Sequence, residues 1–401
     1  MIVSIIGMGY VGLNLAMALP ESFKVIGFDT NSNLVESLNR GISHIEGISN
    51  DSISGKSQKE LFQATYNEED ISHSDIVVIA VPTPLDDSKQ PDMKFLESAC
   101  QIVGRNLKKD CLIINESTSF PGTLREFIKP RVTNLLGGGV SIEFAVSPER
   151  VDPGNETWNL HNTPRLVSGL SSKATLEAHE FYSSFCTEVE IVSSPEVAES
   201  AKLFENTFRQ VNIALVNEFS QITNALGISV YEVLEAAATK PYGFMKFKPS
   251  AGVGGHCIPV DPSYLASKAI ELGVPANFIS LANKTNLEMS DYVVHRILQD
   301  HKFNLKGTKI QLVGVAYKPD VADTRETPAA RIIDSLKIQG ANITWHDPLV
   351  REWRGEKSTP LTRSDIIVVV TMHSIFASIP FNSFSPYIFD TTGTLPVANK
   401  L

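Results

Sequence analysis

Short runs of apolar residues, many of them β-branched, recur through the first 150 residues, and each run ends at turn-forming or polar residues. Runs of this length without strict alternation predict strands that are buried on both faces. They cover residues 2–6, 24–29, 75–81, 111–116 and 142–146. A second group of such runs follows near the C-terminus, at residues 309–314, 341–347, 365–371 and 387–390. The fold class expected is therefore α/β, with two doubly wound, Rossmann-like units.

The middle of the chain has a helical pattern instead. Residues 195–226 are apolar around much of a helix circumference, which predicts one long helix buried between domains or between subunits. On this helix Lys202, Asn206 and Arg209 fall on one face. That polar face is either solvated or directed at the site that contains Cys257. The two α/β units are thus joined by a central helical region.

Composition excludes several classes of function. The 401 residues carry 35 basic and 45 acidic side chains, a net charge of −10, and 42% of them are apolar. These values describe a soluble globular protein and argue against nucleic acid or an anionic membrane as the main partner. We expect no membrane span and no signal peptide. The four cysteines are far apart and form no CxxC pair, so no metal site and a cytoplasmic location are expected.

A glycine fingerprint follows the first predicted strand. Gly7, Gly9 and Gly12 have the spacing GxGxxG between a strand and a helix, as a dinucleotide-binding turn requires. The next strand ends in Asp29, 17 residues after Gly12. A carboxylate there can accept the hydroxyls of a ribose and would repel a 2′-phosphate, which favours NAD over NADP.

Polar residues also end the next three predicted strands of this unit. Thr83, Thr118 and Glu149 follow strands whose carboxyl ends should share one edge of the sheet, where ligands bind in doubly wound folds. Thr83 and Thr118 suit turn formation as well as they suit ligand contact. Glu149 is either one half of an ion pair on the rim or a general base.

A glycine-rich loop presents a cysteine. Gly252, Gly254 and Gly255 lead into Cys257, and Asp261 follows between two prolines. The thiol is either a nucleophile activated by its surroundings or a small buried side chain in a structural turn.

Two further segments carry positive charge. Residues 239–248 are aromatic and basic, as a loop over an anionic ligand would be, and they include Phe247. Lys318 and Arg325 follow the first strand of the C-terminal unit, where a parallel sheet places phosphates. Plain surface charge is the alternative for both residues.

Taken together, these motifs resemble the UDP-glucose/GDP-mannose dehydrogenase family along the whole chain. The resemblance rests on seven segments in the same order: GMGYVGL at 7–13, VPTP at 81–84, ESTSFPGT at 116–123, SPER at 147–150, Lys202 with Asn206, GGHCIPVD at 254–261 and YKPDVADTRE at 317–326. Residues 151–154, 205–209, 239–245 and 254–259 look most like the UDP-N-acetylhexosamine 6-dehydrogenase branch.

The resemblance implies a four-electron oxidation at C6 of a UDP-sugar, through a thiohemiacetal and a thioester on Cys257. It implies catalytic roles for Cys257, Lys202, Asp261, Glu149, Asn206 and Thr118. It implies that NAD is bound by Gly7, Gly9, Tyr10, Val11, Gly12, Asp29, Pro82, Thr83, Thr118 and Arg325. It implies that the sugar nucleotide is bound by Glu149, Arg150, Lys202, Asn206, Arg209, Phe247, Gly252, Gly254, His256 and Lys318.

The expected domains are an NAD-binding domain at 1–194, a central helical domain with the cysteine loop at 195–300, and a UDP-sugar-binding domain at 301–401. UDP-N-acetylglucosamine is the first candidate substrate, for a surface polysaccharide precursor, and a homodimer or higher homo-oligomer is expected. The alternatives are a UDP-glucose 6-dehydrogenase and a two-electron alcohol dehydrogenase in which Cys257 is structural.

Overall fold

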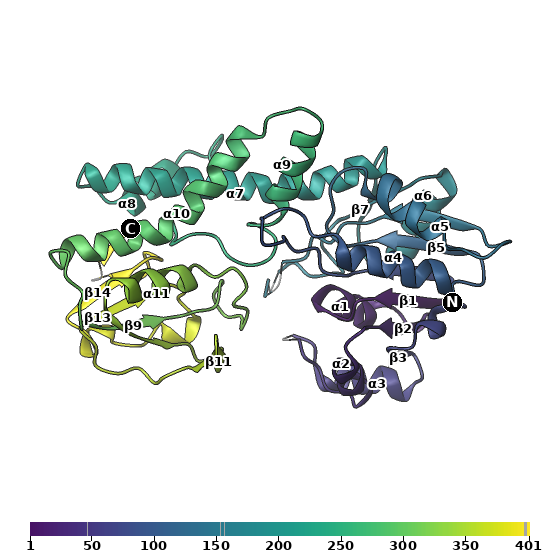
Figure 1. The fold of residues 1–401 in the computed structure, drawn as a ribbon, viewed down its shortest axis with the longest axis horizontal. Helices are drawn as coiled ribbons and strands as arrows, with labels where there is room; N and C mark the ends of the chain where they lie inside the picture. Colours follow the sequence, from purple (N-terminus) through teal and green to yellow (C-terminus); the bar gives the residue numbers. More distant parts are fainter. Residues whose placement is uncertain (46, 153, 156, 397–398) are drawn as a thin grey trace. The chain divides into compact units, whose positions relative to one another are not determined.

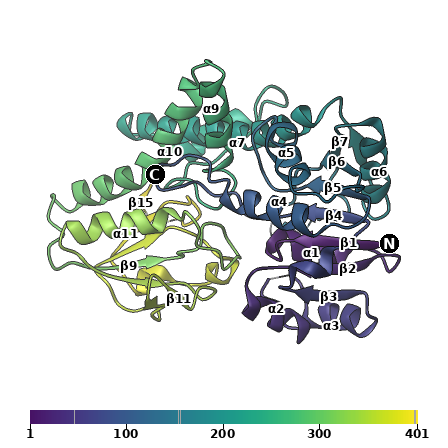
Figure 2. The same ribbon diagram turned by 45° about the vertical axis from the view of Figure 1, so that its right-hand side comes forward.

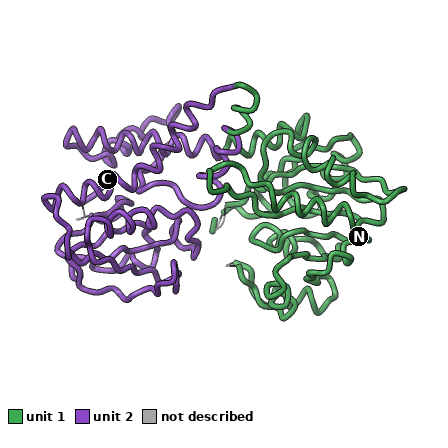
Figure 3. The backbone as a smooth tube through the Cα atoms, viewed as in Figure 1, with its two compact units in different colours: residues 1–205, 267–273 green, residues 206–266, 274–401 purple. Residues whose placement is uncertain are grey.

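A computed structural model of the 401-residue chain describes every residue except 46, 153, 156 and 397–398. The chain forms two compact units (Figure 3). Unit 1 contains residues Met1–Glu205 and Ser267–Gly273, and unit 2 contains Asn206–Ala266 and Val274–Leu401. The predicted segment 151–154 includes residue 153, which lies outside the described residues.

Unit 1 is built on an eight-stranded sheet in the order β3-β2-β1-β4-β5-β6-β7-β8 (Figure 1). Its strands are β1 Ile2–Ile6, β2 Lys24–Phe28, β3 Phe62–Thr65, β4 Ile76–Ile79, β5 Cys111–Asn115, β6 Ile142–Val146, β7 Arg165–Gly169 and β8 Val189–Ile191. All neighbours are parallel except β6 and β7, which pair antiparallel. The predicted strands of this unit are confirmed.

Helices cover both faces of this sheet because alternate strand residues point to opposite sides. Val3 and Ile5 belong to the core shared with α1, α2, α3 and α6, whereas Val77 and Ile79 belong to the core shared with α4 and α5. The helices are α1 Tyr10–Ala18, α2 Ser32–Asn39, α3 Asn50–Gln58, α4 Lys94–Asn106, α5 Lys129–Thr133 and α6 Ser172–Ser183, with short turns η1 Glu68–Ile71 and η2 Thr123–Ile128. The doubly wound arrangement is confirmed.

Unit 2 holds a five-stranded parallel sheet in the order β10-β9-β13-β14-β15. Its strands are β9 Lys309–Val313, β10 Asn342–His346, β13 Ile366–Val369, β14 Tyr387–Asp390 and β15 Asn399–Lys400, beside a two-stranded ribbon of β11 Glu352–Trp353 and β12 Glu356–Lys357. Helices α10 Asn277–Asp300 and α11 Pro328–Ile338 pack side by side over one face (Figure 2). The short turns η3 Ser374–Phe376 and η4 Phe381–Ser383 contribute Phe376 and Phe381 to the core on the other face.

The long helix predicted in the middle is α7, Pro195–Ala225, followed by α8 Val230–Ala238 and by α9 Asp261–Glu271. The boundary between the two units falls inside α7, after Glu205. The three-domain division of the sequence stays a prediction. Among the described residues, none of the helices combines the length and apolar character needed to cross a membrane.

Two parts of the sequence-based description need correction. Strands β3, β7 and β8 and helix α6 were not predicted, because β3 and β8 have only four and three residues and β7 begins with a charged residue. In addition, several apolar residues of α7 are not buried: Phe208 is 41% exposed and Leu215 is 65% exposed.

Candidate active site

The glycine turn lies between β1 and α1. Gly7 has φ +98°, and a Cβ on Gly12 would lie 1.9 Å from the carbonyl oxygen of Gly7, so neither position accepts a side chain. Around Gly9, in contrast, a Cβ would meet no atom within 4 Å. No side chain caps the N-terminus of α1, so the N–H groups of its first turn can bind an anion. The turn therefore fits the pyrophosphate of a dinucleotide.

Asp29 follows β2 beside this turn. Its Oδ2 accepts a hydrogen bond from the backbone N–H of Met8 at 2.9 Å, and its Oδ1 accepts one from Asn31 at 2.9 Å. A carboxylate offers about four acceptor positions, so each oxygen keeps one for a ribose hydroxyl. The geometry fits the role predicted for Asp29 in NAD binding.

The ends of β4 and β5 are tied together at the same edge. The hydroxyl of Ser117 donates to the carbonyl of Val81 at 2.8 Å. This bond joins the segment with Pro82 and Thr83 to the segment with Thr118. Thr83 is buried and Thr118 is partly exposed, so Thr118 is the more accessible of the two hydroxyls.

Glu149 lies in a buried ion pair rather than on the rim. Its Oε2 accepts from Nη2 of Arg165 at 2.7 Å, and its Oε1 accepts from the backbone N–H groups of Arg150 and Val151 at 2.7 Å each. Burial raises the pKa of this carboxyl, but Arg165, these backbone donors and the charge of Lys202 outweigh that effect and hold it below its usual value. Counting only partners among the described residues, Glu149 is thus a fixed carboxylate with one free acceptor position.

Arg150 points to a different partner. Its Nη2 pairs with Oε1 of Glu205 at 2.7 Å, and its Nη1 donates to the carbonyl of Pro164 at 2.8 Å. The charge of Arg150 is therefore already balanced in unit 1, and its predicted contact with the substrate stays a prediction.

The start of α7 brings Lys202 to this edge of unit 1. Glu199, one turn earlier, accepts from the backbone N–H groups of Gly122 and Leu124 at 2.7 and 2.9 Å, which clamps the turn that follows Thr118. Burial raises the pKa of Glu199 to about 8. Lys202 is 8% exposed. Thr118, Glu149 and Lys202 thus belong to one polar edge of unit 1.

Unit 2 brings Cys257, Asp261 and Asn206 together. The side-chain amide of Asn206 donates to Oδ2 of Asp261 at 2.6 Å, and both side chains are buried. The backbone N–H of Asp261 donates to the carbonyl of Cys257 at 2.9 Å at the start of α9. Cys257 is exposed, whereas Cys100, Cys111 and Cys186 are buried. The alternative of a buried structural cysteine at 257 is therefore wrong.

The loop that leads into Cys257 packs against the loop of Lys318 and Arg325, which also belongs to unit 2. A Cβ on Gly254 would lie 2.7 Å from Tyr317, and one on Gly252, at φ +135°, would lie 3.0 Å from the carbonyl oxygen of Asn286. Gly255 donates its N–H to the carbonyl of Arg325 at 2.9 Å. The glycines are thus required for close packing as well as for turning the chain.

Lys318 and Arg325, the two cations of this loop, differ in their surroundings. Arg325 is held by Asp323, with Nη2 and Oδ2 at 2.5 Å, and its pKa is raised by Asp323 first and also by the charges of Tyr317 and Cys257. Arg325 therefore lies near the thiol. Lys318 is partly buried.

The positions of three other predicted substrate-binding residues do not test their roles. Arg209 is exposed and His256 is partly buried. The ring of Phe247 packs edge-on against Phe208, with centroids 6.0 Å apart, beside a small core on α7 and α8. Their contacts with substrate stay predictions.

Sequence reasoning missed a buried group that lies behind Glu149. Arg165 pairs with both Glu116 and Glu149, and the hydroxyl of Tyr182 donates to Glu116. The signal for Glu116 was a charged residue at the end of an apolar strand. Arg165 and Tyr182 gave no signal, since no strand or helix was predicted there.

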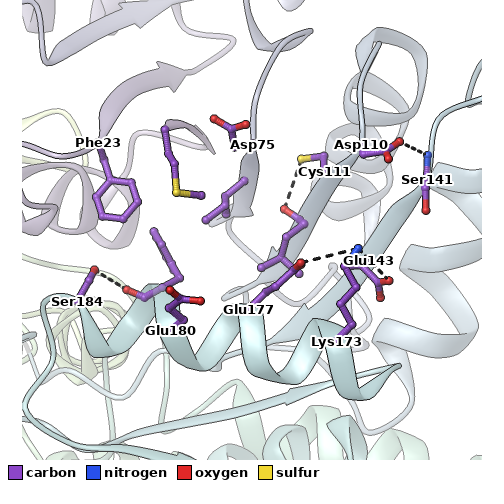
Figure 4. Close-up of a pocket in the computed structure, with 14 residues that line it drawn as sticks. Phe23, Asp75, Asp110, Cys111, Ser141, Glu143, Lys173, Glu177, Glu180 and Ser184 are labelled. Atoms are coloured by element: carbon purple, nitrogen blue, oxygen red, sulfur yellow. Dashed lines mark hydrogen bonds and ion pairs between the residues drawn. The ribbon is translucent and has the colours of Figure 1, made fainter.

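A cavity of about 450 Å³ lies at the opposite edge of the unit 1 sheet (Figure 4). Met1, Asp75, Asp110 and Ser141 line it, and each of them comes just before a strand. The glycine turn comes just after β1, at the other end of these parallel strands. The cavity is therefore separate from the edge of the sheet where the dinucleotide is expected.

A doubly wound unit with a glycine turn fitted to pyrophosphate is typical of dinucleotide-dependent oxidoreductases. Comparison with known proteins identifies the class more closely. The chain belongs to the UDP-glucose/GDP-mannose dehydrogenase family, whose NAD-binding domain matches residues 1–186, whose central domain matches 196–288 and whose UDP-binding domain matches 311–396. It is an NAD-dependent nucleotide-sugar 6-dehydrogenase. The predicted family, α/β fold and cofactor are confirmed.

Individual relatives support this assignment. The chain is 35% identical to protein CapL of Staphylococcus aureus over 86% of its own length and 81% of that protein. It is 34% identical to the UDP-N-acetyl-D-glucosamine 6-dehydrogenase of Pseudomonas aeruginosa, over 87% and 83% of the two chains. The solved structure of a UDP-D-ManNAc dehydrogenase from Pyrococcus horikoshii matches with a TM-score of 0.90 at 31% identity, over 98% of this chain and 96% of that one.

The open space at Gly9 gives a direct test of the nucleotide site. We expect Gly9→Ala to keep the wild-type melting temperature but to weaken NAD binding by about tenfold or more, because the methyl group would occupy the approach of the pyrophosphate. Gly12→Ala is the matched control, since its methyl group collides with Gly7 and should lower the melting temperature itself. Calorimetric titration with NAD and thermal unfolding measure the two effects. Wild-type NAD affinity in Gly9→Ala would place the pyrophosphate elsewhere.

Proposed function

We propose that this protein oxidises the C6 hydroxyl of a UDP-N-acetylhexosamine to the uronic acid, for synthesis of a surface polysaccharide precursor. The observation that carries the proposal is the exposed thiol of Cys257. The backbone carbonyl of Cys257 accepts a hydrogen bond from the backbone N–H of Asp261, and the side chain of Asp261 accepts one from the side-chain amide of Asn206. Relatives named UDP-N-acetyl-D-glucosamine 6-dehydrogenase and UDP-N-acetyl-D-mannosamine dehydrogenase are each 34% identical to the chain. UDP-N-acetylglucosamine is the first candidate, and its manno epimer is the second.

The reaction balances over two oxidations. One hydroxymethyl group, one water and two NAD give one carboxylate, two NADH and three protons. NAD, when bound, accepts one hydride from C6 in each oxidation. Between them the thiolate of Cys257 adds to the C6 aldehyde, which forms the carbon–sulfur bond that the final hydrolysis breaks.

The residues of unit 2 serve the covalent steps. Cys257 is the nucleophile, and its exposure lets an aldehyde reach the sulfur. Asp261 is buried and fixed by Asn206, so it can orient a water or a cation near the sulfur without moving itself. Lys318 and Arg325 follow β9 at the carboxyl edge of the smaller sheet, where they suit the substrate phosphates and the cofactor respectively.

The residues of unit 1 serve hydride transfer and hydrolysis. Lys202 is a buried cation, which can stabilise the oxyanion that forms as C6 is attacked. Thr118 offers a hydroxyl at the end of β5 for the alcohol or for a water. Glu149 stays ionised and has one open acceptor position on Oε2, so it can bind and polarise the water that attacks the thioester.

The substrate assignment is tested by counting NADH. Purified protein is mixed with NAD and, separately, UDP-N-acetylglucosamine, its galacto and manno epimers, and UDP-glucose. We expect two NADH per sugar with an N-acetylhexosamine and slow or no turnover with UDP-glucose. Two NADH from UDP-glucose alone would reject the N-acetyl assignment and keep the mechanism. One NADH per sugar would reject the four-electron reaction.

The role of Cys257 is tested by its removal. We expect Cys257→Ala to form no uronic acid, a loss of about 10³-fold or more, because the aldehyde cannot be held for the second oxidation. NAD affinity should match that of the wild type, since the thiol is not part of the glycine turn. Cys100→Ala, at a buried cysteine of α4, is the control and should still make acid. Acid formation by Cys257→Ala at the wild-type rate would disprove the covalent route.

We also propose that two copies of the chain pair through α7. Phe208, Leu215 and Ile222 are spaced seven residues apart on this helix and are 41%, 65% and 48% exposed. Such a spacing forms one exposed apolar stripe, which a second copy can cover. This stripe supports the predicted homodimer.

The dimer is tested by placing a charge on the stripe. We expect Leu215→Glu to sediment as a monomer at concentrations where the wild-type protein is a dimer, because a carboxylate would lose its water at the interface. Asn224→Glu places the same charge at an exposed residue on the opposite side of α7 and is the control. A Leu215→Glu variant that remains dimeric would exclude this face of α7.

A further inference from the structure

A buried arginine lies directly behind Glu149, and the sheet topology places it there. Strands β1 to β6 are parallel, so their carboxyl ends share one edge, but β7 runs antiparallel to β6. Val146 pairs with Ser168. Continuing this register by three residues brings Arg165, the first residue of β7, opposite Glu149. The one change of strand direction thus delivers a cation from the start of a strand to the edge where the others end.

Arg165 bridges two carboxylates. Its Nη1 lies 3.1 Å from Oε1 of Glu116, and its Nη2 lies 2.7 Å from Oε2 of Glu149. The side chains of Arg165, Glu116 and Glu149 are 2%, 0% and 13% exposed. The ring of Tyr182 lies under the guanidinium, 5.0 Å from it, and its hydroxyl donates to Oε1 of Glu116 at 2.5 Å. Glu149 is the most exposed of these three charged side chains.

The charges of the group are unequal. Two carboxylates share one guanidinium, and Oε2 of Glu116 has no hydrogen-bond partner among the described residues. Burial, with the nearby charge of Glu149, raises the pKa of Glu116 to about 7 despite Arg165 and Tyr182. The pKa of Glu149 is lowered instead, since two backbone N–H groups add to the effect of Arg165. The cation therefore favours the ionised form of the carboxylate nearer to solvent.

We infer that Arg165 is a positioning residue for Glu149, which fixes the carboxylate so that its open acceptor position on Oε2 binds the hydrolytic water. Arg165 itself touches no reacting atom. This inference rests on the proposed function of Glu149 in thioester hydrolysis. In that step water attacks the thioester carbon, the carbon–sulfur bond breaks, Cys257 leaves as a thiolate, and the water protons pass to solvent.

The position of Arg165 predicts a defect in one half of the reaction. We expect Arg165→Met to give the first NADH at close to the wild-type rate but to release acid at least about tenfold more slowly. The sugar–thioester on Cys257 should then accumulate and be visible in the intact mass of acid-quenched protein. A general loss of structure would slow both halves together.

The pH profile gives a second readout. Loss of the cation raises the pKa of Glu149, so the fraction of ionised Glu149 falls at a higher pH than in the wild type. The acid limb of hydrolysis should therefore move to higher pH in Arg165→Met, and Arg165→Lys should move it back. The other titratable groups facing Glu149 are Lys202, Glu116, Tyr10 and Cys186, and these variants leave all four in place.

Two controls separate the possible failures. Glu149→Gln must accumulate the thioester, and if it does not, the proposed role of Glu149 fails and this inference fails with it. Tyr182→Phe removes a bond to Glu116 but leaves the pair of Arg165 with Glu149, so it should lower the melting temperature and keep hydrolysis.

The arginine variants decide the inference itself. Arg165→Met leaves two carboxylates without their cation and is the harder variant to fold. If it does not fold, Arg165→Lys replaces it, because lysine keeps the charge but reaches one carboxylate at a time. A folded Arg165 variant without thioester accumulation, while Glu149→Gln accumulates it, would overturn the inference.

Discussion

The guanidinium of Arg165 fills the point where three strands of the larger sheet meet their loops. Removing three charged groups from water costs several kcal/mol per ion, and only close pairing offsets this cost. Glu116 follows β5, Glu149 follows β6, and Arg165 begins β7. The loops that follow Glu116 and Glu149 therefore start from positions that cannot shift without breaking a buried ion pair. Thr118 and Arg150, a residue or two further on, inherit that rigidity.

Unit 2 uses a comparable device on a smaller scale. The buried carboxylate of Asp347 follows β10, and its Oδ2 accepts from the backbone N–H groups of Val315 and Ala316, just after β9. The same oxygen lies 3.0 Å from Nε2 of His373, whose Nδ1 accepts from the N–H of Asp320 at 2.9 Å. The loop of Lys318 and Arg325 is thus held at its start and near its middle. In both units a buried charge at the carboxyl edge shapes the loops that carry the predicted site residues.

Features that a local sequence pattern determines could be predicted, whereas features that depend on residues distant in the sequence could not. Nine strands and α7 were predicted because each is a local run of apolar residues, and the glycine turn was predicted because its spacing is local too. Arg165 could not be found in this way, since its burial follows from the reversed direction of β7. Glu149 was recognised as a residue of interest, but the choice between ion pair and base could not be made without Arg165. Likewise the exposure of Phe208 and Leu215 depends on what packs against α7, which no local pattern reveals.

Burial also selects which thiol can react. In Cys100 and Cys111 burial raises the pKa to about 12, and in Cys186 to about 11, so these side chains remain neutral thiols at neutral pH. Each also lacks access to a substrate, because all three are buried. Cys257 differs in access, since it is exposed. The glycines of the cysteine loop therefore do more than turn the chain, because they also let the loop that carries the exposed thiol pack closely against the loop of Arg325.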